Sequence, residues 1–309
     1  MKFYESSFES KYENKKIAYS VFEPDDGAAC AILQISHGMC EYIGRYYHFA
    51  EFLTSHGFIV CGNDHLGHGR SAENDDMLGV MPRNAAEILS DDAHKLTLIM
   101  KQKYPDLPYF LLGHSMGSFI ARIYLTKYGE ELDGAIIMGT GGPESPAAAG
   151  KLLAKMVGAF KGSNYRSKLI DKVAFGSYNS HFGKDCSPKA WLTRDDDIVE
   201  RYVNDKFCTY LFTVDAFYSL FDMLGSVSAK DWAQKLPKNV PLLVTSGAQD
   251  PVGNYGRGVR AVYERIKAAG VSDVTLKMYP DDRHEILNEL DREQVYADIL
   301  DWLCGIIKK

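Results

Sequence analysis

The feature that most constrains this chain is a G-x-S-x-G motif that stands between a predicted strand and a predicted helix. The motif is Gly113-His114-Ser115-Met116-Gly117; an apolar run at 109–112 precedes it, and a plausible helix continues over 119–128. A serine in this position lies on a strained turn that exposes its hydroxyl above the edge of a sheet. The pattern predicts a nucleophile at Ser115, against the alternative of a glycine-flanked strand end without chemistry.

The local chemistry of this turn favours the catalytic interpretation. Because glycine has no Cβ atom, Gly113 and Gly117 let the strand and helix backbones pass close to the turn. The first N–H groups of the helix have no intrahelical acceptor and lie at the positive end of the helix dipole. An oxyanion that formed beside Ser115 would be stabilised there.

Strands and helices alternate along most of the chain. Apolar runs predict strands at 29–36, 58–63, 109–112, 134–138, 240–246 and 274–279, and apolar spacing and stop signals predict helices at 46–55, 84–104, 119–128, 259–269 and 292–307. Such alternation is typical of α/β proteins whose mainly parallel sheet is covered by helices on both faces. Residues 3–22 instead predict an antiparallel hairpin at the sheet edge.

The alternation stops near residue 144 and resumes near residue 232. We therefore assign 1–143 and 232–309 to the α/β core and 144–231 to an inserted helical cap, here called the cap segment. Its many aromatic residues more often form a small core of their own than a ligand site. A cap that closes over a serine must nevertheless supply part of the pocket wall, and pockets are mostly apolar.

One predicted helix of the cap segment has an apolar stripe beside lysines. The stripe is Leu152, Leu153, Met156, Val157 and Phe160, with Lys151, Lys155 and Lys161 next to it. We expect the stripe to pack inside the cap segment, because its area is small for stable anchoring at a lipid surface. The alternative is a transient contact with a membrane surface.

A serine hydroxyl needs a base to take its proton and a third group to hold that base. When the nucleophile lies on this kind of turn, the acid and then the histidine follow it in the chain. Of the histidines, only His181 and His284 follow Ser115; His181 lies in the cap segment, whereas His284 comes just after a predicted strand. Asp250 also follows a strand, so we predict a triad of Ser115, Asp250 and His284.

Three other aspartates fit the role of the acid less well. Asp281 and Asp282 stand too close to His284 in sequence to orient it from across the site, and Asp222 falls inside a predicted helix. A triad is judged by its geometry, so Asp250 is the prediction that the folded chain must test.

The strand at 29–36 runs into His37-Gly38-Met39, the place where this kind of fold takes a second oxyanion donor. We predict that the backbone N–H groups of Met39 and Met116 form the oxyanion hole. An ordinary glycine turn is the alternative at residues 37–39.

The next loop contains Asp64, His65 and His68, which suggest a metal site. No second cluster supplies the remaining ligands that zinc would need, so we predict a tight structural loop instead. We expect no metal and no cofactor, and activity that survives chelators.

Charge and hydropathy narrow the class of protein further. A formal net charge of −6 argues against a nucleic-acid partner. The first residues lack the apolar core of a signal peptide, and no apolar stretch approaches the ~20 residues that a membrane helix needs. Among six scattered cysteines, Cys30 and Cys61 lie in apolar runs, which favours buried thiols over disulfides. We expect a cytoplasmic protein.

Taken together, the motifs resemble those of the monoglyceride lipase and lysophospholipase group of α/β-hydrolases. The likeness is carried by residues 113–117, His37-Gly38-x-x-Glu41 with Arg45-Tyr46, Asp64-His65-x-Gly67-His68-Gly69-x-Ser71, Ser246-Gly247-x-x-Asp250 and His284. It covers the core on both sides of the cap segment. The resemblance implies an α/β-hydrolase fold with a helical cap, hydrolysis of a small-molecule acyl ester, and no cofactor.

The resemblance also implies that Glu41 and Arg45 bind the polar end of the substrate. Because the two are spaced i,i+4, an ion pair on a helix surface is the competing explanation. The chain departs from the family at Met39-Cys40, at Ser118 and over 162–220. These departures leave the substrate open: we expect medium or long acyl esters such as monoacylglycerols or lysophospholipids, with small aromatic or acetylated esters, or a non-catalytic receptor, as alternatives.

Overall fold

The computed structural model describes residues 1–25, 27–144, 146–183 and 186–308. Within these residues, one eight-stranded sheet has the order β1-β2-β4-β3-β5-β6-β7-β8. The strands are β1 (Lys2–Glu9), β2 (Lys16–Glu23), β3 (Ala31–Ser36), β4 (Phe58–Asn63), β5 (Tyr109–His114), β6 (Gly134–Met138), β7 (Leu242–Gly247) and β8 (Val274–Tyr279). Strands β3 to β8 pair in parallel, and β1 and β2 form an antiparallel hairpin at one edge. The predicted α/β class and the hairpin are confirmed.

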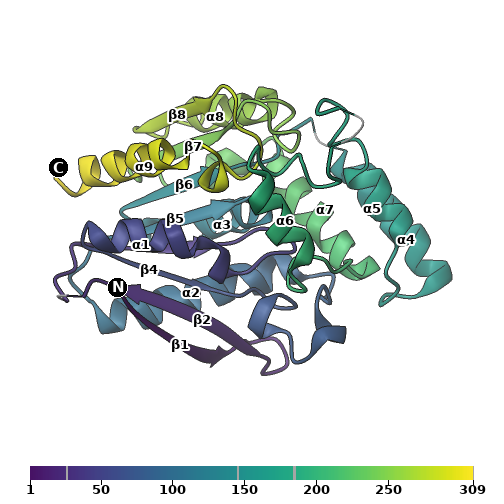
Figure 1. Ribbon diagram of the computed structural model, residues 1–309, viewed down its shortest axis with the longest axis horizontal. Coiled ribbons are helices and arrows are strands. Elements are labelled where there is room, and N and C mark those ends of the chain that lie inside the picture. Colours follow the sequence, from purple (N-terminus) through teal and green to yellow (C-terminus); the bar gives the residue numbers. More distant parts are fainter. Residues whose placement is uncertain (26, 145, 184–185, 309) are drawn as a thin grey trace.

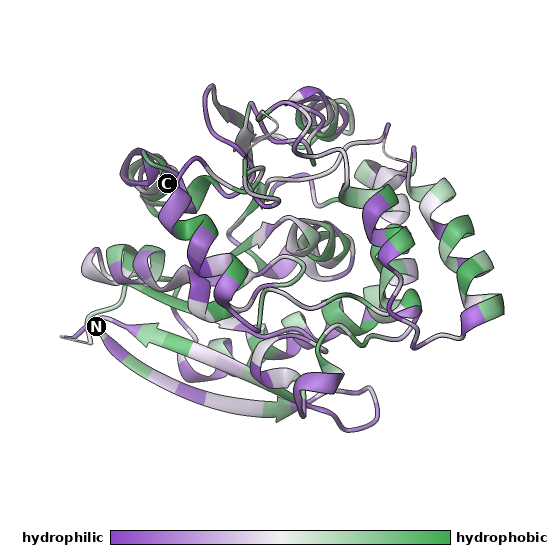
Figure 2. Cartoon of the chain, turned by 45° about the vertical axis from the view of Figure 1, so that its right-hand side comes forward, coloured by the Kyte–Doolittle hydropathy of each residue, from purple (hydrophilic) through white to green (hydrophobic). Residues whose placement is uncertain are grey.

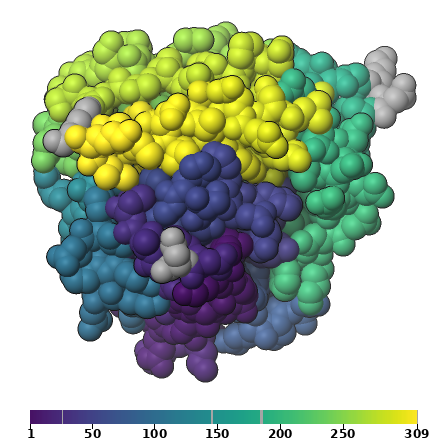
Figure 3. Space-filling model, turned by 60° about the vertical axis from the view of Figure 1, so that its left-hand side comes forward, coloured from purple at the N-terminus to yellow at the C-terminus, as the bar shows by residue number. Residues whose placement is uncertain are grey.

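Helices cover both faces of this sheet (Figure 1). Alternate strand residues enter different cores: Ile32 belongs to the core that also contains side chains of α2 (Ala85–Lys103), α3 (Met116–Tyr128) and α8 (Arg257–Ala268). Leu33, the next residue, packs with side chains of α1 (Tyr47–Ser55) and α9 (Arg292–Ile307). Figure 3 shows α9, in yellow, lying against α1 on the outside of the molecule. Successive residues point to opposite faces, and helices bury both faces. The strands are therefore continuous apolar runs in the sequence.

The cap segment supplies the helices between β6 and β7, which gather at one end of the sheet (Figure 1). They are α4 (Ala147–Lys161), α5 (Lys168–Phe175), α6 (Asp196–Asn204) and α7 (Val214–Ser228). Helix α7 packs against both α3 and α4, so it joins this group of helices to the core. The limits 144–231 stay a prediction, and residues 145, 184 and 185 lie outside the described part.

Two predictions about burial are wrong. Cys30 is exposed rather than buried, although Cys61 is buried and all six cysteines are free. The stripe of α4 packs inside the cap segment only through Leu153 and Val157. Leu152, Met156 and Phe160 are 58%, 49% and 88% exposed, and Figure 2 shows green, apolar residues on this outlying helix. Neighbouring helices therefore cover only part of the apolar stripe of α4, and the rest faces solvent.

Candidate active site

The turn at Ser115 has the strain that its motif predicts. Ser115 has φ 53° and ψ −121°, a backbone conformation that costs energy for a residue with a side chain. The strand and helix approach closely here, because a Cβ atom at Gly117 would lie 1.9 Å from the Ser36 carbonyl oxygen and one at Gly113 would lie 2.3 Å from the Gly117 carbonyl oxygen. The two glycines are therefore sterically required on both sides of Ser115.

The fold brings the three predicted triad residues to the carboxyl edge of the parallel strands. Ser115 follows β5, Asp250 follows β7 and His284 follows β8. The Nδ1 atom of His284 lies 3.0 Å from Oδ2 of Asp250, an ion-pair distance, although this Nδ1 has no well-aligned hydrogen-bond acceptor among the described residues. Asp250 is fully buried, and it accepts hydrogen bonds from the Ser246 hydroxyl and the Val252 N–H, which fix its orientation.

The rival aspartates are engaged elsewhere. Asp282 accepts a hydrogen bond from Arg194 at 2.6 Å, and Asp222 forms an ion pair with Lys151 on α4. Asp281 is exposed to solvent. Asp250 is thus the aspartate of this set that the structure brings to His284.

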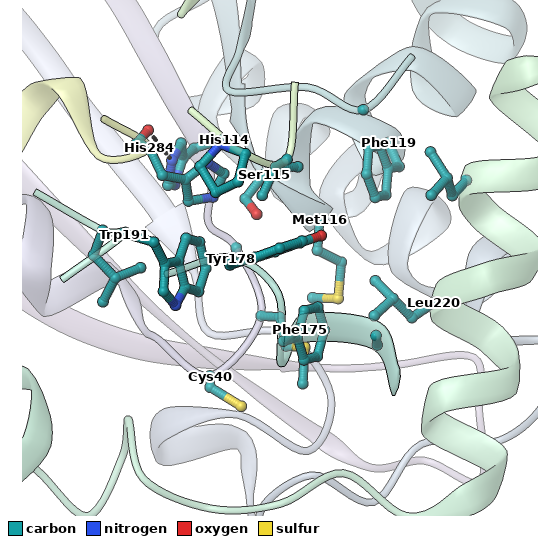
Figure 4. A pocket seen from close by; sticks show the side chains of 18 of the residues that line it. Cys40, His114, Ser115, Met116, Phe119, Phe175, Tyr178, Trp191, Leu220 and His284 are labelled. Carbon is teal, nitrogen blue, oxygen red and sulfur yellow. Dashed lines mark hydrogen bonds between the residues drawn. The ribbon is translucent and has the colours of Figure 1, made fainter. Parts of the chain in front are cut away.

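A cavity of about 430 Å³ opens in front of Ser115. Figure 4 shows the Ser115 hydroxyl directed into it, with the rings of His114 and His284 on one side. The core and the cap segment both line this space, and the apolar and aromatic part of the wall includes Met116, Phe119, Phe175, Tyr178, Trp191, Tyr202, Tyr210, Leu220, Phe221 and Leu224. A volume of this size and lining suits a small organic substrate with an apolar part.

The two predicted oxyanion donors also belong to this wall. Met39 lies in the loop after β3, and Met116 directly follows Ser115 in the chain. Both residues line the cavity. Met116 is the first residue of α3, so its N–H has no acceptor within the helix. The loop of Met39 lies close to the serine, because a Cβ atom at Gly38 would lie 3.0 Å from Cβ of Ser115.

One piece of the cap segment, residues 190–195, is fastened to the loop that carries His284; we call it the strap. The N–H groups of His284 and Glu285 donate hydrogen bonds to the carbonyl oxygens of Trp191 and Leu192, at 3.4 and 2.7 Å. Arg194 forms ion pairs with Asp282, Glu289 and Asp291 behind them. The strap therefore holds the Trp191 ring against the His284 ring, with centroids 5.1 Å apart.

Glu41 and Arg45 form the ion pair that their spacing allows, at 3.1 Å, and both side chains are largely buried. Arg45 also donates two hydrogen bonds of 2.7 Å to the carboxylate of Glu285. Glu41 and Glu285 line the cavity, whereas Arg45 is not among its described lining residues. The structure gives both predicted residues a structural contact, and their binding of substrate stays a prediction.

His114 completes this buried cluster directly beside the nucleophile. Its Nδ1 lies 3.1 Å from Glu41 Oε1, and its Nε2 lies 3.3 Å from the carbonyl oxygen of His284. Burial lowers the pKa of His114, but the hydrogen bond and charge of Glu41, together with the charge of Glu285 and the His284 carbonyl, raise it, so the net pKa lies above the ordinary value. Burial raises the pKa of Glu41, yet His114 and Arg45 lower it more, so Glu41 is a carboxylate. A doubly protonated His114 satisfies both acceptors.

A pH-dependent stability follows from the raised pKa of His114. A histidine whose pKa is higher in the folded state contributes stability that is fully present below its unfolded pKa, about 6.5, and is lost as pH rises through the folded pKa. His114→Gln should therefore reduce the free energy of unfolding by about 1–3 kcal/mol at pH 6. It should also flatten the decline from pH 6 to 9, measured by chemical denaturation.

The exposed His48 on α1 offers a matched control, because His48→Gln removes a histidine without touching this cluster. That variant should keep the slope of the unchanged protein. An equally steep decline in His114→Gln would show that His114 does not carry the pH dependence.

The loop of His65 and His68 is part of the packed core. Asp64 accepts hydrogen bonds from the backbone N–H groups of Ile43 and Arg70, which occupies both of its carboxylate oxygens. Burial lowers the pKa of His65, and lowers that of His68 to about 3. These contacts give the loop the structural function that its glycine spacing predicts.

Sequence reasoning missed His114, Glu285 and Trp191 as parts of the site. His114 lies inside the motif and Glu285 follows His284, so their positions were visible, but the motif does not say which way each side chain points. Arg45 and Glu285 are 240 residues apart, and nothing in the local pattern links them. Trp191 belongs to the cap segment, where helical spacing alone does not identify the inner wall.

A mainly parallel sheet that presents a serine on such a turn defines a class, and this chain is a serine hydrolase of the α/β-hydrolase fold. The family model described as serine aminopeptidase, S33, matches residues 27–291, and the chain belongs to that family.

Similar proteins narrow the activity. The chain is 28% identical to a monoacylglycerol lipase of Mycolicibacterium smegmatis, over 94% of this chain and 93% of that protein. It is 27% identical to the monoglyceride lipase of Homo sapiens, over 90% of this chain and 83% of that protein. A solved carboxyl esterase from Bacillus coagulans, in complex with glycerol, has a TM-score of 0.90 at 33% identity, with 99% of each chain covered. The chain is accordingly a serine ester hydrolase.

Proposed function

We propose that this enzyme hydrolyses medium- and long-chain monoacyl esters, such as monoacylglycerols or lysophospholipids, through an acyl intermediate on Ser115. The observation that carries the proposal is the position of Ser115: it lies on a strained turn and faces a largely apolar cavity, beside a buried His284–Asp250 pair. The names of the similar lipases support the same class of substrate.

The proposed reaction uses each group in turn. Oγ of Ser115 attacks the ester carbonyl carbon while Nε2 of His284 takes the hydroxyl proton. The backbone N–H groups of Met39 and Met116 donate hydrogen bonds to the oxyanion that forms. The alcohol leaves with the proton of His284, and a water molecule activated by His284 then releases the fatty acid and restores Ser115.

Asp250 supports this cycle without touching the substrate. Its carboxylate lies 3.0 Å from Nδ1 of His284, so it holds the tautomer in which Nε2 is free to accept a proton. It also stabilises the imidazolium that exists between the two proton transfers.

A fluorophosphonate probe tests the proposed nucleophile directly, because it reacts with an activated serine. We expect one covalent adduct on Ser115, located by mass spectrometry of digested protein, and none on Ser115→Ala. Ser118, one turn along α3, supplies the control: Ser118→Ala should still be labelled. If the wild-type protein stayed unlabelled, Ser115 would not be an activated nucleophile. A non-catalytic receptor on this fold would then be the remaining interpretation.

The exposed residues Leu152, Met156 and Phe160 on α4 make a transient lipid contact a further part of this proposal. Apolar side chains beside lysines suit the surface of an anionic membrane. Cosedimentation with anionic vesicles, lost in Phe160→Asp, is the measurement that decides it. None of the helices in the described part combines the length and apolar character that crossing a membrane requires. The cytoplasmic location stays a prediction.

A further inference from the structure

Two opposite charges from the cap segment face the cavity without pairing directly. Asp171 lies on α5, and Lys189 lies in the chain that leads into the strap. Lys189 is the only lysine or arginine among the described residues that line the cavity. No direct ion pair joins these two described side chains, although Lys189 is close enough to affect Asp171: burial raises the pKa of Asp171, and the charge of Lys189 opposes that rise. Because both residues line the same cavity, a ligand bound there can contact both side chains.

Aromatic rings surround these charges. Nζ of Lys189 lies 5.6 Å from the ring centroid of Tyr202 and 6.0 Å from that of Trp191. The Trp191 ring is 5.1 Å from that of Tyr178, edge to face, and Tyr178 in turn packs against Phe175, the last residue of α5. The faces of such rings attract cations, including quaternary ammonium groups.

The chemistry of the reaction decides which part of the substrate meets this end of the cavity. His284 must give its proton to the leaving alcohol, so the alcohol part lies on the His284 side of the ester. The Trp191 ring packs against His284 there. Figure 4 shows Trp191 on one side of Ser115 and Phe119 and Leu220 on the opposite side. The acyl chain is thus directed towards Phe119 and Leu220, and the head group towards Lys189 and Asp171.

We propose that Lys189 and Asp171 form a subsite for a zwitterionic head group, and that the enzyme prefers lysophospholipids of the phosphocholine type to neutral monoacylglycerols. Lys189 binds the phosphate, and Asp171 with the neighbouring aromatic rings holds the ammonium group. This inference rests on the proposed function of Ser115. A neutral glycerol compensates the two partly desolvated charges less well than a ligand with opposite charges at both ends.

Four octanoyl esters, used below their micelle-forming concentrations, test the subsite. They are 1-octanoylglycerol, octanoyl-lysophosphatidylcholine, octanoyl-lysophosphatidate with only the phosphate, and octanoylcholine with only the ammonium. We expect the wild type to have a higher kcat/KM for octanoyl-lysophosphatidylcholine than for 1-octanoylglycerol. Lys189→Met should lower that ratio about tenfold or more, mainly through KM, because a hydrogen bond to a charged group is lost.

Asp171→Asn gives a sharper test, because the two charged substrates should respond in opposite directions. Activity on octanoyl-lysophosphatidylcholine and octanoylcholine should fall, whereas activity on octanoyl-lysophosphatidate should rise when a repelling carboxylate is removed. Lys189→Arg, which keeps the charge, should keep the preference of the wild type. The exposed Lys172→Met on α5 removes a nearby charge outside the cavity and should leave all four ratios unchanged.

Equal losses on all four esters in Lys189→Met and Asp171→Asn would overturn the subsite, and so would a wild type that prefers 1-octanoylglycerol. Turnover of p-nitrophenyl octanoate by the wild type separates this failure from a failure of the proposed function. If that ester and all four others are inert, the role of Ser115 is wrong, and the subsite is wrong with it.

Discussion

Replacing Asp250 by asparagine should lower the kcat of ester hydrolysis about 10⁴-fold, the loss seen when the acid of a serine-protease triad becomes an amide. The fold should survive, because the amide oxygen can still accept the N–H of Val252, at 2.8 Å in the unchanged protein. The amide NH₂ would then face Nδ1 of His284 and favour the tautomer whose Nε2 carries a proton. Such a histidine cannot take the proton of Ser115. Ser115→Ala and His284→Ala should remove nearly all turnover, because the first removes the nucleophile and the second removes the base.

Hydrolysis of p-nitrophenyl octanoate, with thermal unfolding measured on each variant, gives the readout. Asp281→Asn is the matched control, because it makes the same chemical change on an exposed side chain three residues before His284. It should keep activity within about twofold. Near-normal turnover by Asp250→Asn would show that another group holds His284, and Asp282 would be the next residue to replace.

The second large effect concerns the length of the acyl chain. The cavity wall near Phe119, Leu220 and Leu224 is apolar, and each buried methylene contributes up to about 0.8 kcal/mol. Since about 1.36 kcal/mol is tenfold in rate, kcat/KM should rise up to about fourfold per carbon. In a series of p-nitrophenyl esters, we expect a rise from acetate to at least octanoate. The rise should stop where the chain reaches the end of the pocket.

A variant that fills the apolar end of the cavity tests whether the acyl chain binds there. Leu224→Trp should move the optimum to shorter esters, because overfilling a packed space costs about 1–3 kcal/mol. Leu98→Trp on α2 is the control, since Leu98 is exposed and outside the cavity. A wild-type profile that peaks at acetate or butyrate would contradict the long-chain proposal and favour an esterase for small substrates.

The core of the fold could be predicted because its signals are local. Apolar runs set the strands β3 to β8, and parallel pairing brings their carboxyl ends to one edge, where Ser115, Asp250 and His284 follow three different strands. The three residues could then be predicted from their order in the chain, without knowing where each side chain points. Helix limits were less accurate: α3 begins at Met116, three residues before the predicted start, because a strained turn leads directly into it.

The rest of the site depends on contacts that no local pattern encodes. The exposed position of Cys30 depends on how the preceding loop passes the end of α1, and its apolar neighbours do not reveal that. Helix α4 has an apolar stripe in sequence, but only its packing on α7 decides which half is covered. The positions of Lys189 and Asp171 at one end of the cavity follow from the path of the cap segment, which helical spacing does not determine.

The hydrogen bonds of the strap limit where substrates can enter the cavity and where products can leave it. A cap that lifted away at residues 190–195 would pull on the backbone of His284 and Glu285, because their N–H groups are bonded to Trp191 and Leu192. Opening at that point would therefore displace His284, the proposed base, each time a substrate entered. An opening that keeps these two hydrogen bonds has to leave residues 190–195 in place.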